Sequence, residues 1–533
     1  MHFSLQIITA LRKPMKLSKE NIMKQFKNIP YIILYGTIAV LFFFINWILF
    51  YYDKNVYYLG SEIGILPNFL LILPIFICIV WLVIFIHNNS KLHRLKLWHL
   101  LLAQIVLLMI QLFISYNIYF FTGWDASTIR NTAFQIIEHP ELIAENFRHY
   151  YSFHVNQTTM AIILGYIMKF FYNLGIQNFY FGTVVVSVLS INLTGLFSTL
   201  SVQKITNSTK LSLIYWVLFG LLVGLSPWIT IPYSDTYSML FPSIALFLYV
   251  NMPKSILRYM TWFIIAFVSI VGMLIKPQTI IVLLAIIILE TYKLVTQIEL
   301  RKAINFSIIA VIIYATSILS NGIYTKSLEL IDFGLIPGRN FTYSHYLMTG
   351  FNPVTFGVYY DHDASLSYST ATIEEREAKN WEVILKRIDN YGFVGYLDFS
   401  VRKILTNFND GTFAWGGEGG FYVEIFEQKT FASDFLRDIY YHTGRYVNIF
   451  FQFVQFIWLL VLVLIPFGIL TKDKTNYSKA VVYITILGIF AFTHLFEARG
   501  RYLLTYIPFF IMAAVFALGV IEERLSIYFK KRL

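Results

Sequence analysis

Cysteine and charged residues are both scarce in this sequence. The single cysteine, Cys78, lies inside an apolar run, so the chain cannot form an internal disulfide and any external region must fold by packing alone. Charged residues make up 13% of the chain and hydrophobic residues 57%, whereas soluble globular proteins carry about 25% charged residues. This composition excludes an ordinary soluble globular protein.

Nucleotide-binding motifs are missing as well. The glycine-rich run Gly416-Gly417-Glu418-Gly419-Gly420 lacks the Lys-Ser/Thr ending of a phosphate-binding loop, and the sequence has no dinucleotide fingerprint. These absences disfavour an ATP-driven pump. We expect the glycine-rich run to form a turn, with Glu418 as a minor candidate for a functional site.

Long apolar runs fill the chain instead. About twelve of them are long enough to cross a bilayer as helices, and they are too long for the strands of a membrane barrel. The predicted spans are residues 30–51, 66–86, 98–120, 180–201, 211–227, 236–252, 259–276, 279–296, 303–322, 448–470, 479–496 and 502–521. The predicted fold class is an all-α polytopic membrane protein, with interfacial helices in its first large external loop and a small mixed external domain.

The positive charges indicate how these spans are oriented. The formal net charge is +11, and Lys and Arg residues recur in alternate connections, as is typical of the cytoplasmic side of a membrane protein. The basic connections are the N-terminus, residues 87–97, 202–210, 253–258, 297–302 and 471–478, and the C-terminus. The pattern predicts a multi-pass protein of the cell membrane, in contact with membrane lipids and without a nucleic-acid partner.

Residues 158–175 form a further apolar segment that does not fit this orientation. Counting the segment as a span would put either Asp125 or Asp235 inside and would scramble the basic connections. Its central Lys169 and its flanking aromatic residues suit a helix that lies in the outer interface, which is our prediction. A true crossing is the alternative.

The spans and loops predict four parts of the chain. Residues 1–97 hold an N-terminal tail and the first two spans, and residues 98–322 form a transmembrane core with an external loop at residues 121–179. Residues 323–447 form an external domain, and residues 448–533 hold the C-terminal spans. Within the external domain, residues 372–391 are predicted to be helical, because Thr372 and Glu375 form a capping-box pattern.

Titratable residues stand at the ends of several spans, all on the predicted outer side. They are Asp125, Asp235, Lys276 and the cluster Glu497-Ala498-Arg499-Gly500-Arg501. A charged residue at membrane depth costs about 2.5–3.5 kcal/mol on insertion scales, so such residues are usually functional. Carboxylates and phosphate-matching cations at one membrane face suggest chemistry on a lipid-linked phosphate.

Transfer of a sugar from a polyprenyl phosphate needs these residue types. The phosphate departs as an anion, so the reaction requires a carboxylate base near the acceptor hydroxyl and cations at the phosphate. A glycoside hydrolase would instead need a close pair of carboxyls. Asp125 is the first candidate for the base, with Trp124 beside it to stack on a sugar or to anchor at the interface. Asp235 would orient the substrate or tune Asp125.

The cations are the candidates for the donor phosphate. Arg499 and Arg501 would offer planar forks to phosphate oxygens, and Lys276 ends a span on the same side. Each candidate also has an ordinary structural interpretation. Asp125 could be a solvated loop residue, Asp235 could cap the helix that follows it, and Lys276 could snorkel to the interface.

A metal site is a further alternative. Asp361, His362 and Asp363 carry groups that bind divalent cations, but no second group of ligands stands out. We therefore predict no cofactor, and a divalent metal at these three residues is the alternative.

The order and sidedness of these motifs resemble the GT-C superfamily of membrane glycosyltransferases, in the bacterial branch related to protein mannosyltransferases and aminoarabinose transferases. The features that carry the resemblance are Asp125 in the first external loop, a Tyr-Ser-x-Tyr-Pro-Asn-Asn-like stretch from Tyr151 to Gln157, Asp235 before a span, Lys276-Pro277, a Thr-His-Tyr-like segment at Ser344-His345-Tyr346, and Glu497 to Tyr502. The likeness covers most of residues 98–510 and makes residues 98–322 a GT-C-like core. His154-Val155 replaces the family's Tyr-Pro, and Gln157 replaces an Asn.

The resemblance implies an inverting transfer from a polyprenyl-phosphate sugar to an envelope glycopolymer, lipid or protein, with the active site facing outside. It implies Asp125 as the base and the basic residues at the phosphate. The predicted site residues are Asp125 and Asp235 for catalysis, Lys276, Arg499 and Arg501 for the donor phosphate, and Trp124, Tyr151, Asn156, His345 and Glu497 for the substrate.

Two other functions remain open from the sequence. One is a flippase or transporter of lipid-linked sugars. Such proteins carry charges near mid-membrane and repeated halves, whereas the spans of this chain are almost free of mid-depth charge and no internal repeat is visible. The other is an envelope polysaccharide polymerase or ligase, which would depend on external arginines and not on Asp125.

Overall fold

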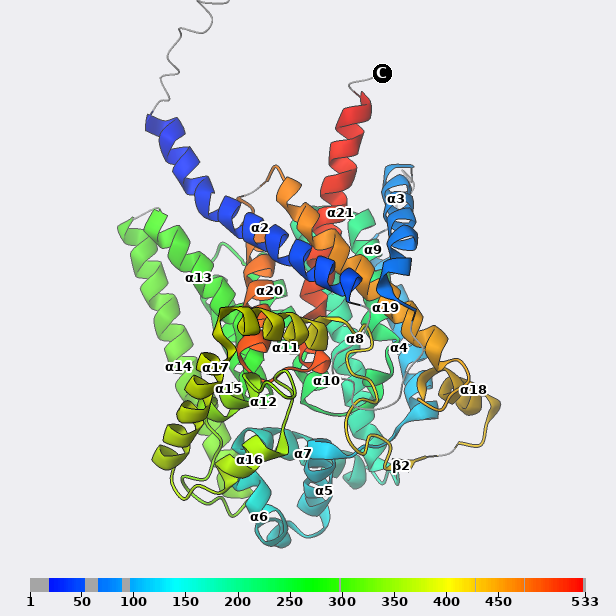
Figure 1. Ribbon diagram of the computed structural model, residues 1–533, viewed down its shortest axis with the longest axis vertical. Helices are drawn as coiled ribbons and strands as arrows, with labels where there is room; N and C mark the ends of the chain where they lie inside the picture. The colour runs from blue at the N-terminus through cyan, green and yellow to red at the C-terminus, as the bar shows by residue number, and fades with distance from the viewer. Residues whose placement is uncertain are drawn as a thin grey trace, which may run out of the picture.

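The computed structural model describes residues 19–52, 66–88, 96–296, 299–426, 428–473 and 475–530. In these ranges nearly all regular structure is helical, and the described sheet consists of two short strands (Figure 1). The predicted all-α polytopic class is confirmed. The basic residues predicted before residue 19, at residues 91–94 and at residues 531–532 lie outside the described residues.

Ten helices in the described part of the chain are long and apolar enough to cross a membrane, by length and composition. They contain α2 (Lys19–Tyr51), α3 (Ile72–Asn88, preceded by η1, Asn68–Leu71), α4 (Leu97–Ile118), α8 (Phe179–Thr206), α12 (Leu257–Ile275), α13 (Ile281–Thr296), α14 (Leu300–Leu330), α19 (Val447–Leu464), α20 (Tyr477–Leu495) and α21 (Ile507–Lys530). Ten of the twelve predicted spans therefore coincide with helices of sufficient length.

The other two predicted spans coincide with shorter helices. Residues 211–227 match α9 (Thr209–Phe219), which continues as a π-helix, η5 (Gly220–Gly224). Residues 236–252 match α10 (Ser234–Ser238) and α11 (Leu240–Val250), which are separated at Met239. The span count of twelve stays a prediction, because neither segment reaches the length of the other ten.

A buried polar network joins α4, α8 and α9 inside the bundle. Gln104 Nε2 donates to the Asn192 carbonyl at 2.6 Å, and Asn192 Nδ2 donates to Gln111 Oε1 at 2.8 Å. Gln111 Nε2 donates to the Gly224 carbonyl at 2.9 Å, at the end of the π-helix, where a backbone acceptor needs a partner. Trp216 Nε1 donates to Gln104 Oε1 at 2.8 Å. The network fixes the exit of α9 toward the segment that carries Asp235.

The first loop region forms three packed helices. These are α5 (Trp124–Glu138), α6 (Ile143–Phe153) and α7 (Thr158–Asn173). The helices α5 and α7 lie in close contact. At Gly165 of α7 there is no room for a side chain, since a Cβ atom would come within 2.5 Å of the Ile136 side chain of α5. The segment predicted to lie in the interface is thus the helix α7, whose buried face packs on α5. Its position relative to a bilayer stays a prediction.

The second loop region contains α15 (Tyr343–Gly350), α16 (Asp361–Tyr368), α17 (Ile373–Phe408) and α18 (Phe431–Tyr440). The helix predicted at residues 372–391 is longer than expected, because α17 continues to Phe408 across a kink at Gly392, whose φ is 54°. Thr372 accepts a hydrogen bond from the Glu375 amide at 3.2 Å, as the capping pattern predicts. The far part of α17 packs against α2 and α20. The four-part division of the chain stays a prediction.

The two loop regions are joined by the antiparallel pair of β1 (Phe120–Phe121) and β2 (Glu424–Ile425). The remaining short helices are η3 (Pro140–Leu142), η4 (Val155–Gln157), η6 (Pro227–Thr230), η7 (Pro277–Ile280), η8 (Ile465–Leu470) and η9 (Gly500–Tyr506). In Figure 1 the start of α2, the end of α21, the end of α13 and the start of α14 lie toward one end of the molecule. The helices α5, α6, α7 and α16 lie toward the other end. The elements that flank three of the predicted basic connections are therefore separated from the first external loop, and their orientation in the cell stays a prediction.

The polar network between α4 and α9 makes a testable contribution to stability. A double-mutant cycle of Gln104→Leu and Trp216→Phe should give a coupling energy of about 1 kcal/mol, because each single change leaves a buried polar group of the other residue without a partner. Thermal unfolding in detergent measures it. Additive effects of the two changes would contradict a contribution from this contact.

Candidate functional site

Asp235 lies at the centre of a buried ion cluster. It stands in the first turn of α10 and has no solvent-exposed surface. One carboxylate oxygen, Oδ1, binds Lys276 Nζ, and the other, Oδ2, lies 3.1 Å from Arg501 Nη1. The N-cap of α10 is Tyr233, so N-capping does not account for Asp235. Both of its oxygens are used to hold cations.

Lys276 and Arg501 reach Asp235 from other parts of the fold. Lys276 connects α12 to η7 in an extended conformation, with Pro277 following it at the first helical position. Its side chain is buried and lies 5.0 Å from the centre of the Tyr502 ring, so Lys276 does not snorkel to the surface. Arg501 stands in η9 with its guanidinium 5.2 Å from the same ring. The cluster thus joins α10, η7 and η9.

Glu418 extends the cluster to Arg499. Its Oε1 lies 2.9 Å from Arg501 Nε, and its Oε2 lies 3.2 Å from Arg499 Nη2. Glu418 comes from the glycine-rich run and is buried together with both arginines. The five residues Asp235, Lys276, Glu418, Arg499 and Arg501 are called the ion cluster below.

Glu497 lies beside the ion cluster. Burial raises the pKa of its carboxyl, while the charges of Arg499 and Arg501 and the Tyr502 hydroxyl oppose that rise. The fold brings together the three predicted phosphate ligands, Lys276, Arg499 and Arg501. Each of them already faces a carboxylate of the chain itself, either Asp235 or Glu418. A phosphate that binds here would compete with Glu418 for the arginines.

The turn that carries Asp125 rests on the same glycine-rich run. The amide of Gly123 donates to the Gly420 carbonyl at 2.9 Å, and a Cβ atom on Gly123 would come within 2.4 Å of that oxygen. Trp124 follows with a φ of 43°, and α5 begins there with Asp125 in its first turn. Glycine is therefore required at position 123. Gly420, which this turn contacts, stands two residues after Glu418 in the glycine-rich run.

Asp125 is surrounded by tyrosines that reach toward the ion cluster. Burial and the Asp125 carboxylate both raise the pKa of the Tyr150 phenol. Burial and Asp125 likewise raise the pKa of Tyr233, while Arg501 lowers it. Burial raises the pKa of Tyr346 first, and the charges of Glu497 and Asp125 add to this effect. Tyr233 thus lies within electrostatic reach of both Asp125 and Arg501, and Tyr346 lies within electrostatic reach of Asp125 and Glu497.

The predicted substrate residues have different surroundings. Tyr151 is buried, and its hydroxyl donates to Thr132 Oγ1 at 2.9 Å, which ties α6 to α5. Asn156 is exposed in η4. Trp124 is half-buried, with its ring 5.1 Å from that of Phe421. Of these three predicted residues, Trp124 adjoins Asp125 directly.

His345 lies in an aromatic stack and not on an open surface. Its ring is 3.8 Å from the ring of Phe341, and Nδ1 lies 2.8 Å from Ser367 Oγ. Burial lowers the pKa of His345 to about 3, with His154 and Arg376 adding to this effect. His345 and His154 both pack on the Phe341 ring, at 3.8 Å and 5.0 Å between ring centres.

Several residues of the site were not among the sequence candidates. Tyr233, Tyr346 and Tyr502 stand next to or two residues from Asp235, His345 and Arg501, so proximity to those motifs was the available signal. Gln157 donates from Nε2 to the Tyr233 hydroxyl at 3.3 Å, and it stands at the end of the Tyr151–Gln157 motif. Glu418 was only a minor candidate.

The possible metal site at residues 361–363 is not assembled. Asp363 is buried, and its carboxylate binds Arg387 at 2.6 Å and accepts from Asn352 at 2.8 Å. Asp361 and His362 are exposed. In the part of the chain that the structure describes, no three His, Cys, Asp or Glu residues are grouped to hold a metal ion.

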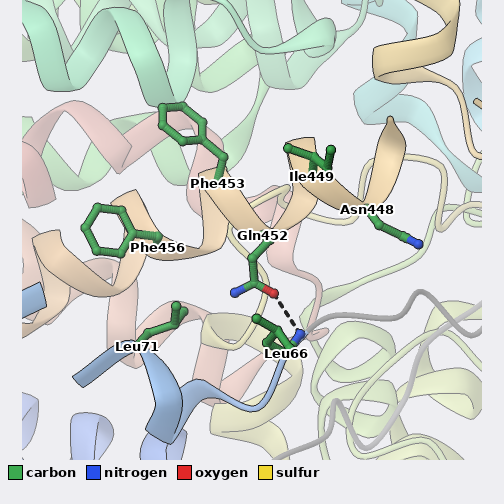
Figure 2. Close-up of a pocket in the computed structure, with 7 residues that line it drawn as sticks. All are labelled: Leu66, Leu71, Asn448, Ile449, Gln452, Phe453 and Phe456. Carbon is green, nitrogen blue, oxygen red and sulfur yellow. Dashed lines mark hydrogen bonds between the residues drawn. The ribbon is translucent and has the colours of Figure 1, made fainter. Parts of the chain in front are cut away.

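An open apolar groove lies elsewhere in the structure, beside the start of α19 (Figure 2). It has a volume of about 450 Å³ and is lined by Leu66, Leu71, Asn448, Ile449, Gln452, Phe453 and Phe456. Gln452 Oε1 accepts a hydrogen bond from the Leu66 amide at 2.7 Å. The groove contains none of the predicted site residues.

Comparison with known proteins identifies the family. A family model described as "Conserved hypothetical integral membrane protein" matches residues 20–520. The chain belongs to this family. No curated protein matches it at a significant level. Among solved structures, this integral membrane protein is similar to ArnT from Cupriavidus metallidurans bound to undecaprenyl phosphate, with 11% identity and a TM-score of 0.29 over 81% of this chain and 79% of ArnT. A TM-score this low assigns no shared fold.

In this integral membrane protein, Lys403 fixes the turn that carries Glu497. Lys403 is fully buried on α17, and its Nζ donates to the Phe496 carbonyl at 2.7 Å and to the Gly350 carbonyl. Asn407, one helical turn further on, donates to the Thr493 carbonyl at 3.1 Å. The Thr493 carbonyl belongs to the last turn of α20, and the Phe496 carbonyl belongs to the residue that follows this helix. Carbonyls at a helix end have no partner within the helix. The helix α17 therefore positions the start of the Glu497–Arg501 segment.

Lys403 makes the free energy of unfolding depend on pH. Burial lowers the pKa of Lys403 to about 7, with Glu497 opposing this effect, whereas an unfolded lysine titrates near pH 10.4. The unfolded chain then binds more protons than the folded protein between these values, so the free energy of unfolding rises with pH. The melting temperature of Lys403→Met should therefore fall further below that of the wild type as the pH is raised from 7 to about 9.

Thermal unfolding in detergent at several pH values measures this difference. The exposed Lys386 lies on the same helix, and Lys386→Met should keep the wild-type pH dependence. A constant gap between wild type and Lys403→Met over this range would contradict the burial of a titrating lysine.

Proposed function

We propose that this protein is a membrane glycosyltransferase that transfers a sugar from a polyprenyl-phosphate donor to an acceptor of the cell envelope, with inversion at the sugar. The observation that carries the proposal is the common neighbourhood of one carboxylate and several cations. Tyr233 lies within electrostatic reach of both Asp125 and Arg501, and Gly123 beside Asp125 contacts the run that carries Glu418. A base and a phosphate site are what the reaction requires.

In this proposal Asp125 is the catalytic base. It removes the proton from the acceptor hydroxyl as the oxygen attacks the sugar carbon, and the bond to the donor phosphate breaks on the opposite side. Asp235, at the centre of the ion cluster, has both oxygens bound to cations. In contrast, no ion pair of Asp125 is found in the described residues. Asp235 is therefore better suited to positioning Lys276 and Arg501 than to accepting a proton.

The arginines would stabilise the leaving phosphate. A sugar phosphodiester carries one negative charge, and the monophosphate that departs carries about −1.5 to −2 at pH 7. Charge thus develops on the phosphate during the transfer, and preformed guanidinium groups in a buried site stabilise it. Lys276 adds a third cation within the ion cluster.

The aromatic residues around Asp125 support a sugar ligand. Sugars present apolar ring faces to aromatic side chains and hydroxyls to polar groups, and tyrosine offers both an apolar ring and a hydroxyl. Trp124 has a buried indole nitrogen without a hydrogen-bond partner, and the buried Tyr150 hydroxyl interacts with Asp125. We propose these groups as contacts for the sugar or the acceptor, which would be an envelope glycopolymer, lipid or protein on the outer face.

The base assignment is tested by Asp125→Asn, which removes the charge and keeps the shape of the side chain. We expect the rate of sugar transfer from a purified polyprenyl-phosphate donor to fall by about 10²–10⁴-fold, because general-base catalysis contributes that much. Asp434→Asn, at an exposed position on α18, is the matched control. If Asp125→Asn still consumes the donor at the wild-type rate, Asp125 is not the base.

The donor site is tested by Arg499→Ala. A hydrogen bond to a charged group contributes about 1.5–3 kcal/mol, which corresponds to roughly a ten- to hundredfold rise in the KM for the donor. Arg499 is chosen because it does not contact Asp235, whereas Arg501 does. Arg445→Ala changes an exposed arginine and should leave the KM unchanged. Movement of lipid-linked sugar across liposomes without any transfer product would instead support a flippase.

A further inference from the structure

We propose that Glu418 is an internal substitute for the donor phosphate, and that the phosphate displaces it and thereby adjusts the turn of Asp125. This inference rests on the proposed function and concerns the regulation of the same site. In the structure one carboxylate contacts both arginines, with Glu418 Oε1 at 2.9 Å from Arg501 Nε and Oε2 at 3.2 Å from Arg499 Nη2. A phosphate group that bridged the same two guanidinium groups would need the positions of these oxygens.

Glu418 leaves hydrogen-bond donors of both arginines without a partner. Arg501 Nε and Glu418 Oε1 are close, but their alignment makes no hydrogen bond, and both atoms are buried without one. Arg499 Nε is also buried without a hydrogen-bond partner. Unpaired buried donors are costly, and a tetrahedral phosphate offers oxygens in more directions than a planar carboxylate does. An incoming phosphate can therefore satisfy donors that Glu418 leaves unsatisfied.

The charge balance favours the exchange. Within the ion cluster, the three cations Lys276, Arg499 and Arg501 face the two carboxylates Asp235 and Glu418. When Glu418 leaves, the cluster has an excess of two positive charges. The single charge of the donor phosphodiester replaces that of Glu418, and the monophosphate formed when the bond breaks neutralises the remaining excess. A neutral isoprenoid alcohol would not restore this balance.

The segment that carries Glu418 is able to move. Glycines flank Glu418 on both sides, and Gly416 and Gly420 have φ values of 72° and 64°, which glycine adopts without strain. A Cβ atom built on Gly419 would meet no atom within 4 Å. Rotations at Gly417 and Gly419 can thus withdraw Glu418, while Gly416 stays packed against the His442 ring.

The displacement is coupled to Asp125 through Gly420. The Gly420 carbonyl accepts the hydrogen bond from the Gly123 amide, two residues before Asp125, and the two glycines are in direct contact. A shift of the run changes the position of Gly420 and hence of the turn that begins α5. The structure therefore predicts ordered binding, in which the donor phosphate engages first and the base then takes up its position for the acceptor.

Equilibrium binding tests the displacement directly. The purified full-length protein is titrated with farnesyl phosphate, and with farnesol as the uncharged comparison. We expect Glu418→Gln, which keeps the size of the side chain and removes its charge, to bind farnesyl phosphate about tenfold more tightly than the wild type does, because the competing anion is gone. Binding of farnesol should not change. The exposed Glu382 lies on α17, and Glu382→Gln should bind as the wild type does.

The outcomes separate this inference from the proposed function. If the wild type binds farnesyl phosphate no better than farnesol and transfers no sugar, the proposed function fails. If the wild type binds the phosphate and Glu418→Gln binds it equally or more weakly, the proposed function stands and the displacement is wrong.

A second measurement covers the case in which Glu418→Gln does not fold. Hydrogen exchange of the wild type should become faster at the amides of residues 416–420 and at Gly123 on addition of farnesyl phosphate, since the run would leave its position against Gly123. Farnesol should have no such effect. Slower or unchanged exchange at these amides, with the phosphate bound, would overturn the inference.

Discussion

The contacts of Asp235 are the constraint on which the arrangement of the site depends. A carboxylate with no exposed surface holds Lys276 and Arg501, and these residues come from three segments that the chain reaches only after crossing the bundle several times. Removing one partner of a buried ion pair typically costs about 3–5 kcal/mol, because the other charge is left without compensation. The positions of α10, η7 and η9 are therefore interdependent. Arg501 in turn contacts Glu418, and so the glycine-rich run is held by the same interaction.

The polar groups of the site are connected to the surrounding fold by backbone contacts. Lys403 and Asn407 of α17 bind carbonyls at the end of α20, and the Gly123 amide binds the Gly420 carbonyl. The acceptors in these bonds are backbone carbonyls, which every residue carries, so the contacts depend on the close approach of the chains. Gly350 shows this closeness, since a Cβ atom there would come within 2.3 Å of the Leu495 carbonyl. The site is thus positioned by segments that are far apart in the sequence.

Much of the fold followed from the sequence because hydropathy and length are local properties. The runs that became α2, α3 and α4 could be identified from their own residues, and so could the N-terminal end of α17 at Thr372. The break at Met239 between α10 and α11 could not, because the apolar run continues through it. It follows a segment whose conformation depends on Asp235 and its distant partners, and no residue within the run indicates those partners.

The candidate site shows the same limit. Asp235, Lys276 and Arg501 were each recognised from their place at the end of a span, but the sequence gives no information on which charge pairs with which. Glu418 had only a glycine-rich context. Lys403 resembles any lysine of a surface helix, and its burial depends on the kink at Gly392, which turns the second half of α17 against α2 and α20. Whether Asp125 and Arg501 act on one substrate stays a prediction.

The length of α14 has a consequence for the environment of the protein. A helix of 31 residues is about 46 Å long at a rise of 1.5 Å per residue, whereas the hydrocarbon core of a bilayer is about 30 Å thick. The helix must either tilt or project beyond the lipid tails. The hydroxyl of Tyr324, near the C-terminal end of α14, lies 3.0 Å from the hydroxyl of Thr158 at the start of α7. This contact would carry a tilt of α14 to the start of α7, so we expect the position of α7 relative to the membrane surface to depend on lipid acyl length.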